Sequence, residues 1–114
     1  MDVRIIKEPI TRVELKKIAE ERFRDLVKAV VDVELGILAL GAELHADEEA
    51  ALLEQGSEQN NLWGINLYPD IIDENWTEFD SVINVRPSRN NRSRSVEDED
   101  IRKKIVDIVN NLIR

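Results

Sequence analysis

One short stretch of the chain is rich in arginine and contains no acidic residue. Residues 81–96 carry four arginines and no aspartate or glutamate, although the 114-residue protein has 24 acidic and 16 basic residues and a formal charge of −8. A guanidinium group presents a planar pair of donors that suits phosphate or carboxylate. We therefore predict a site for an anionic ligand or partner in the loop over residues 86–94, built from Arg86, Ser88, Arg89, Asn91, Arg92 and Arg94.

The same loop also has a plainer interpretation. It leads into a predicted helix whose free amides would attract an anion, but acidic residues at 97–100 compete for that helix end. A flexible loop whose arginines pair with the acidic surface of the protein would show the same pattern. Both interpretations stay open on the sequence alone.

Two predicted strands extend the possible site. Residues 62–68 and 79–86 alternate in polarity, and alternate residues of a strand face the same side of a sheet. Asparagine is unfavourable inside strands, so an asparagine in each strand indicates either ligand binding or a solvent-facing surface. If the two strands are neighbours, one polar face would collect Asn66, Tyr68, Asn84 and Arg86.

The chain has a single histidine, which lies beside carboxylates. His45, Asp47 and Glu48 could hold a divalent metal ion or supply a general base, so a small metal-assisted hydrolase is the alternative function. The spacing matches no metal-binding motif such as HExxH, and one histidine makes a poor zinc site. A histidine that merely lies near an acidic helix start explains the pattern too.

Composition excludes several classes of protein. The absence of cysteine rules out disulfides and thiolate metal sites. The sequence has no glycine-rich nucleotide motif and no nucleophilic-serine motif, so we expect no cofactor. The net negative charge argues against nucleic acid as a partner. Since no signal peptide and no apolar run of about 20 residues is found, we expect a cytoplasmic protein without membrane contact.

Local signals divide the chain into strands and helices. We predict strands at 3–6, 29–34, 37–40, 62–68 and 79–86. A capping box at Thr11 and Glu14 opens an amphipathic helix of about 17 residues, and Ser95 opens a second helix as a near capping box. Residues 46–55 could form a helix or a strand.

These elements predict one α+β domain over residues 1–114. The N- and C-terminal amphipathic helices would pack on one face of a mostly antiparallel sheet of four to five strands. The other face would be left to solvent, a ligand or a second subunit. Because large apolar side chains and an open face suit a self-association surface, we expect a homodimer.

The chain also resembles a family of short prokaryotic proteins classed as a domain of unknown function. The resemblance lies in residues 43–47, 62–69 and 83–88 and extends over nearly the whole chain. It implies a free-standing cytoplasmic domain and assigns no catalytic residue, cofactor or substrate. The leading hypothesis is therefore a small binding or interaction protein, and the sequence leaves open whether it is an enzyme.

Overall fold

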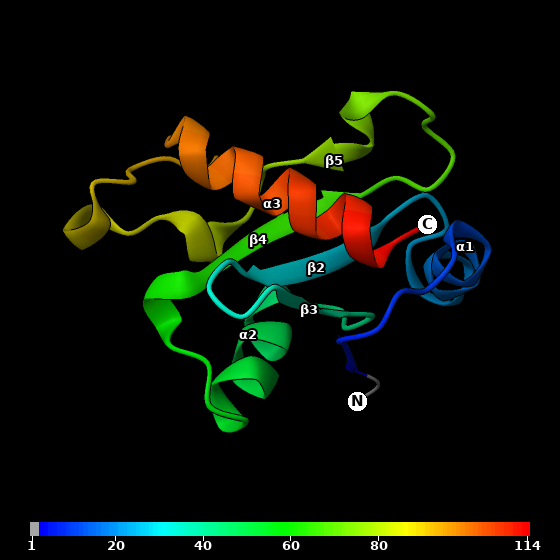
Figure 1. The fold of residues 1–114 in the computed structure, drawn as a ribbon, viewed down its shortest axis with the longest axis horizontal. Coiled ribbons are helices and arrows are strands. Elements are labelled where there is room, and N and C mark those ends of the chain that lie inside the picture. Colours follow the sequence, from blue (N-terminus) through cyan, green and yellow to red (C-terminus); the bar gives the residue numbers. More distant parts are fainter. Residues whose placement is uncertain (1–2) are drawn as a thin grey trace.

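The computed structural model describes residues 3–114, which form one antiparallel five-stranded sheet and three α-helices (Figure 1). In chain order the elements are β1 (Arg4–Ile6), α1 (Arg12–Arg22), β2 (Val27–Asp32), β3 (Ile37–Leu40), α2 (His45–Glu54), β4 (Leu62–Leu67), β5 (Thr77–Glu78) and α3 (Glu99–Leu112). The spatial order of the strands is β1-β3-β2-β4-β5. The predicted α+β class with a largely antiparallel sheet is confirmed. None of the helices in residues 3–114 has the length and apolar character needed to cross a membrane.

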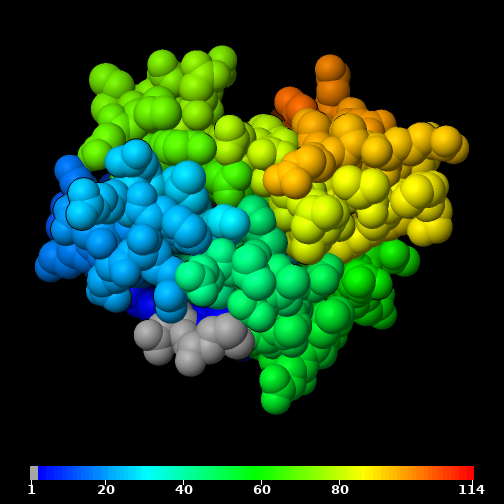
Figure 2. Space-filling model, turned by 180° about the vertical axis from the view of Figure 1, so that it is seen from behind, coloured from blue at the N-terminus to red at the C-terminus, as the bar shows by residue number. Residues whose placement is uncertain are grey.

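Both faces of this sheet are covered. On one face, α1 and α3 bury the larger core against alternate residues of the central strands, such as Ile65 on β4. On the other face, Leu52 of α2 packs with Val30 and Leu62. Figure 1 shows α3 crossing in front of the strands, and residues 40–60 lie over the lower part of the opposite side in Figure 2. The expectation of an open second face is therefore wrong, because α2 covers it.

Helix α1 begins where the sequence predicts and ends sooner. The hydroxyl of Thr11 accepts a hydrogen bond from the Glu14 N–H (3.1 Å), and the Glu14 carboxylate accepts one from the Thr11 N–H (3.4 Å), which completes the capping box. The helix stops at Arg22, short of the predicted 17 or so residues. Arg24 adopts a φ of 69°, a left-handed conformation in which an α-helix cannot continue.

The segment over residues 46–55, for which helix and strand were both possible, is helical. Helix α2 begins at His45 and ends before Gly56, whose φ of 109° is accessible to glycine at little cost. Asp47 lies in the first turn, where a negative charge favours the helix dipole. The cap position itself is held by Leu44 without a side-chain hydrogen bond.

The predicted strand over residues 79–86 does not form. Strand β5 ends at Glu78, and the chain then makes a 3-10 turn at Val82–Asn84. The side chain of Asn84 takes the place of a strand backbone: its Oδ1 accepts from the Gly64 N–H (2.8 Å) and its Nδ2 donates to the Gly64 carbonyl (2.9 Å). The buried residues of this segment, Ser81 and Asn84, are three apart, which fits a 3-10 turn and not the alternation of a strand.

The close approach of this turn to β4 depends on glycine. A Cβ added to Gly64 would lie 2.5 Å from the Cβ of Ser81. Any side chain at this position would push the segment away from the strand, because real Cβ atoms do not approach so closely. Gly64 thus allows Asn84 to reach the edge of β4.

The predicted polar sheet face forms only in part. Asn66 and Tyr68 share one side of the strand end, and both donate to the same carboxylate oxygen of Glu78, at 2.9 and 3.1 Å. Asn84 and Arg86 do not join them, because the turn directs one into the edge of β4 and the other to a different part of the molecule.

Helix α3 starts later than predicted. Asp98, not Ser95, is its N-cap, and Asp98 Oδ1 accepts from the N–H groups of Asp100 (2.8 Å) and Ile101 (3.4 Å). The predicted amphipathic character of this helix is confirmed, because Ile105, Val109 and Leu112 are buried.

We predict that Asn84→Ala lowers the free energy of unfolding by about 2–4 kcal/mol, because it removes three hydrogen bonds and leaves buried backbone groups of Gly64 without partners. Urea unfolding monitored by circular dichroism measures the change. The control is Asn60→Ala, an exposed asparagine, which should stay within about 0.5 kcal/mol of the wild type. Equal stability of the two variants would contradict the role given to Asn84.

Candidate functional site

One turn sets the direction of the loop arginines. Residues Pro87–Arg89 form a 3-10 turn in which the Arg89 N–H donates to the Arg86 carbonyl (2.9 Å). Both guanidinium groups lie near the ring of Trp63, so Arg86 and Arg89 project to the same side. Asn90 then adopts a φ of 61°, which asparagine tolerates, and the chain turns back to pair Asn91 with Arg86.

The two loop asparagines predicted to bind a ligand face the protein's own backbone. Asn91 is 3% exposed, and its Nδ2 donates to the carbonyls of Asn84 (2.7 Å), Ser93 (3.2 Å) and Ser95 (2.8 Å). Its Oδ1 accepts from the Glu97 N–H at 2.9 Å. Asn84 and Asn91 therefore shape the loop that carries the arginines, and their polar atoms are already used.

Arg86 is held by an acid and by two carbonyl groups. Its Nη2 contacts Glu49 Oε2 at 2.7 Å, and its Nη1 donates to the carbonyls of Gln59 (2.7 Å) and Leu62 (2.8 Å). The side chains of this ion pair are only 11% and 14% exposed. Burial lowers the pKa of Arg86, and the charge of Glu49 opposes that change. Arg86, Glu49 and Ser88 also line a groove of about 310 Å³, so this pair is reachable from solvent.

The other two predicted arginines lie on the surface. Arg94 makes an ion pair with Asp80 at 2.6 Å, but both side chains are about half exposed, and such pairs add little stability. The side chain of Arg92 is exposed and, within the described part of the chain, makes no hydrogen bond or ion pair. The structure therefore separates the four arginines into an inner pair and an outer pair.

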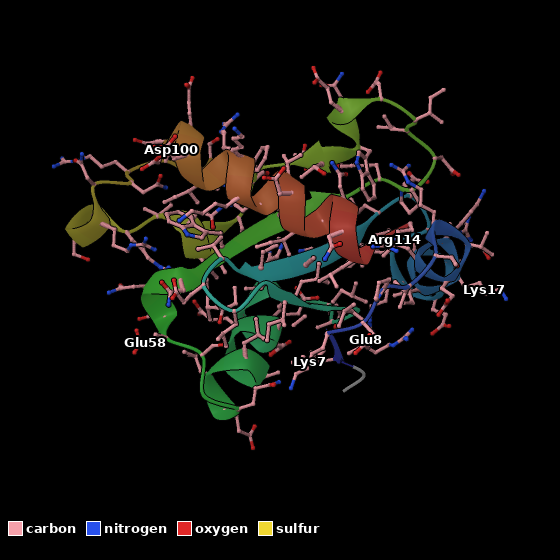
Figure 3. The ribbon with its side chains drawn as sticks, in the orientation of Figure 1. Lys7, Glu8, Lys17, Glu58, Asp100 and Arg114 are labelled. Carbon is pink, nitrogen blue, oxygen red and sulfur yellow. The ribbon has the colours of Figure 1, made fainter. Side chains whose placement is uncertain are left out.

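The amide groups near the start of α3 are already occupied by the chain's own acids. Asp98 caps the helix, and Glu97 Oε2 accepts from the N–H groups of Arg92 (2.9 Å) and Ser93 (2.8 Å). The hydrogen bonds from Ser93 are the main reason that the pKa of Glu97 is lowered. Asp100 projects outward at the same end of the helix in Figure 3. A ligand would therefore have to bind to side chains and not to this helix end.

The inner arginines lie next to a buried tryptophan. The Arg89 Cζ is 4.5 Å from the centroid of the Trp63 ring, and the Arg86 Cζ is 5.7 Å from it. A guanidinium over an aromatic face is stabilised by the ring quadrupole. Burial is the main cause that lowers the pKa of Arg89, and the positive charge of Arg86 lowers it further. Both guanidinium groups therefore lie close to the same aromatic ring.

Two N–H donors in this group have no partner. Trp63 is 1% exposed, and its Nε1 is buried without a hydrogen-bond partner among residues 3–114. The Nη1 atom of Arg89 is also buried and has no hydrogen-bond partner among these residues. A buried donor without a partner costs about 1–3 kcal/mol and calls for an explanation. No sequence signal predicted that Arg89 would stack on Trp63.

A second polar group lies between α2 and the sheet. Residues three apart on a helix share a face, so both His45 and Glu48 are buried. The Nε2 of His45 is 2.7 Å from the Ile65 carbonyl, and burial lowers the pKa of this imidazole. Glu48 Oε2 accepts from the Ala42 N–H (3.1 Å) while its Oε1 has no partner in the described residues, and burial raises its pKa to about 9.

This second group does not have the make-up of a metal centre. Glu48 is protonated at neutral pH, because its pKa is near 9, and a protonated carboxyl group is a poor cation ligand. Asp47 is half exposed and lies on a different side of the helix from its buried neighbours. Throughout residues 3–114, no three histidine, aspartate or glutamate side chains gather where they could hold a metal ion.

Together, these features define a small α+β protein in which a side-chain-supported turn presents two arginines beside a buried tryptophan. The chain belongs to the family described as "Protein of unknown function (DUF5674)", whose model matches residues 4–112. This confirms the expected membership of a family of unknown function. No curated protein and no solved structure matches the chain significantly.

We predict that Glu48 makes stability depend on pH. Its folded pKa is raised from 4.5 to about 9, so the stability that it contributes is complete below pH 4.5 and is lost as the pH rises toward 9. Glu48→Gln cannot ionise. Its advantage over the wild type should therefore grow by about 1 kcal/mol per pH unit between pH 7 and 8.5, as measured by urea unfolding.

The range above pH 7 separates this effect from His45. Because the pKa of His45 is lowered, its contribution is present above pH 6.5 and is lost only as the pH falls. Glu54→Gln, at an exposed position at the end of the same helix, is the control and should follow the wild type. A constant difference between Glu48→Gln and the wild type across this range would show that Glu48 is not protonated in the fold.

Proposed function

We propose that the protein is a binding module for a small anion, with its site at Trp63, Arg86 and Arg89. The observation that carries the proposal is the pair of buried N–H donors without partners, Trp63 Nε1 and Arg89 Nη1. Both are donors, on side chains that stack against each other, and we propose that one negatively charged acceptor satisfies both.

The charge of Arg89 supports the same conclusion. In the described chain, Arg89 has no ion-pair partner within 4.0 Å, whereas Arg86 and Arg94 each have one. Hydrogen bonds between a guanidinium and an anion are shorter and about twice as strong as neutral ones. The partly buried position strengthens them further, because the effective dielectric constant is lower there than in water. An anion next to Arg89 would therefore gain more than one next to the exposed Arg92.

The proposed site contains fewer residues than the loop site that the sequence predicted. Arg86 and Arg89 keep a binding role, and Ser88 borders the groove beside Arg86. Asn84 and Asn91 act through the shape of the loop. Arg92 and Arg94 are exposed, and they would attract an anion at long range without touching it.

The metal-assisted hydrolase has less support. It requires His45, Asp47 and Glu48 to act on one ion, and within the described ranges these side chains are not gathered into a metal-binding group. A neutral imidazole and a protonated carboxyl group would suit proton transfer, but both side chains are buried.

Self-association and location are separate proposals. We propose a cytoplasmic homodimer, supported by the absence of cysteine and by exposed apolar side chains such as Ile72 (94%) and Val13 (66%). Light scattering after gel filtration should give about twice the chain mass of 13.1 kDa. A mass equal to that of one chain would contradict the dimer.

The indole N–H signals of the tryptophans test the anion site directly. Titration of ¹⁵N-labelled protein with sodium acetate should shift the Trp63 indole cross-peak, assigned with Trp63→Phe, because the anion accepts that hydrogen. The cross-peak of Trp76, whose ring lies beneath Arg12, serves as an internal reference and should not move.

Two matched variants identify the arginine involved. Arg89→Gln should weaken acetate binding at least about tenfold, because a hydrogen bond to a charged group contributes about 1.5–3 kcal/mol. Arg92→Gln, an exposed arginine of the same loop, should change it less than about twofold. If the Trp63 signal does not respond to acetate, phosphate or sulfate, the proposed function is wrong.

A further inference from the structure

The loop between β4 and β5 is opposite in charge to the arginine-rich loop. Its residues 68–76, which we call the acidic loop, include Asp70, Asp73 and Glu74 and no basic residue. Ile72 lies among these acids and is 94% exposed, more than any other large apolar side chain in the described chain. The acidic loop therefore combines negative charge with exposed apolar surface.

Glu74 is the acid of this loop whose carboxylate is not already used. Asp70 makes an ion pair with Lys16 at 2.9 Å, and Asp73 Oδ1 accepts from the Asn75 N–H at 2.9 Å. The side chain of Glu74 is exposed and, among residues 3–114, takes part in no hydrogen bond or ion pair. Its carboxylate is therefore available to a group on another molecule.

The acidic loop and the proposed anion site lie at opposite ends of the molecule. In Figure 1 the acidic loop is at the upper right, before β5, and the arginine-rich loop is at the far left. Arg12 of α1 holds the acidic loop by donating to the Ile71 carbonyl (3.0 Å). Glu74 cannot reach Arg89 of its own chain from this position, whereas the acidic loop of a second copy can approach it from outside.

We propose that the anion bound at Trp63 and Arg89 is the Glu74 carboxylate of a second copy, and that the two copies exchange this contact in a twofold dimer. This inference rests on the proposed anion-binding function and names the partner of that site. In a closed twofold pair the two copies make the same contacts to each other, so the contact occurs twice. Each site is then completed by the other chain, which supplies the acceptor that Trp63 Nε1 and Arg89 Nη1 lack.

The surfaces that would meet are complementary in charge and in apolar character. Because the chain has a net charge of −8, two copies repel each other on average, and association needs a local pairing of opposite charges. The guanidinium of Arg89 is partly exposed, so a side chain can reach it from outside. Val82 (65% exposed) and Val85 (40%) line the groove beside Arg86 and offer Ile72 an apolar surface.

Charge-reversal variants test this contact through light scattering after gel filtration. Glu74→Lys and Arg89→Glu, each alone, place like charges in both contacts of the dimer. Each should raise the dissociation constant at least about a hundredfold, from about tenfold for each lost charged hydrogen bond, and give the mass of one chain, 13.1 kDa.

An equimolar mixture of these two variants should restore about twice that mass. In the mixed pair one contact is that of the wild type, and the other joins the new lysine to the new glutamate. Glu54→Lys, which reverses an exposed acid at the end of α2, is the control and should keep the wild-type mass. Thermal unfolding shows that each variant is folded.

Glu74→Gln tests the contact without changing the arginine-rich loop. It should lower the fraction of dimer and should tighten acetate binding, read from the Trp63 indole signal, at least about tenfold, because no carboxylate of a partner then competes. If Arg89→Glu does not fold, the two variants of Glu74 decide, and a wild-type mass for both overturns the inference.

The outcomes separate this inference from the proposed function. If the charge-reversal variants keep the wild-type mass, or if their mixture stays at the mass of one chain, the inference is wrong, and the anion site stands as long as acetate shifts the Trp63 signal. If acetate, phosphate and sulfate leave that signal unchanged in Glu74→Gln as well, the proposed function itself fails.

Discussion

The hydrogen bonds between the Asn84 side chain and the backbone of Gly64 are the constraint on which the site depends. The amide of Asn84 acts as a donor and an acceptor toward one residue of β4, and its Nδ2 also donates to the Arg94 carbonyl. The carbonyl of Asn84 then accepts from Asn91. A chain of buried amides thus connects the edge of β4 to the start and the end of the arginine-rich loop.

This arrangement explains how a loop without regular structure can hold charged groups in fixed directions. The 3-10 turn sets Arg86 and Arg89 on one side, and the amides of Asn84 and Asn91 fix that turn relative to Trp63. Helix α2 contributes from the opposite face of the sheet, because Glu49 holds Arg86 while its neighbour Glu48 is buried beneath the helix. Glu48 and Glu49 are adjacent in α2, and one is buried while the other forms an ion pair with an arginine of the site.

The sequence predicted those elements whose signals are local. The capping box at Thr11, the strand over residues 37–40 and the amphipathic C-terminal helix all depend on residues close together in the chain, and they form as expected. The predicted strand at 79–86 failed, because side-chain hydrogen bonds to a distant strand replaced the backbone ladder. No pattern within a few residues of Asn84 can report such a contact.

For the candidate site too, the sequence predicted only features that depend on residues close together in the chain. The local excess of arginine in the loop is visible in the sequence, but no sequence feature predicted that Trp63 would lie beside it. The separation of the arginines could not be foreseen, because Glu49 and Asp80 come from other parts of the chain. The stacking of Arg89 on Trp63 likewise joins residues that are far apart in sequence.

The position of Asn84 also bears on how the protein avoids aggregation. Strand β5 pairs only with the last two residues of β4, Asn66 and Leu67, so the first half of β4 would otherwise present free backbone groups to another chain. Exposed strand edges of this kind are templates for intermolecular β-pairing. Because the Asn84 side chain occupies the N–H and the carbonyl of Gly64, these two groups are not available to pair with a strand of a second molecule. The residue that orders the loop therefore also keeps the sheet from growing.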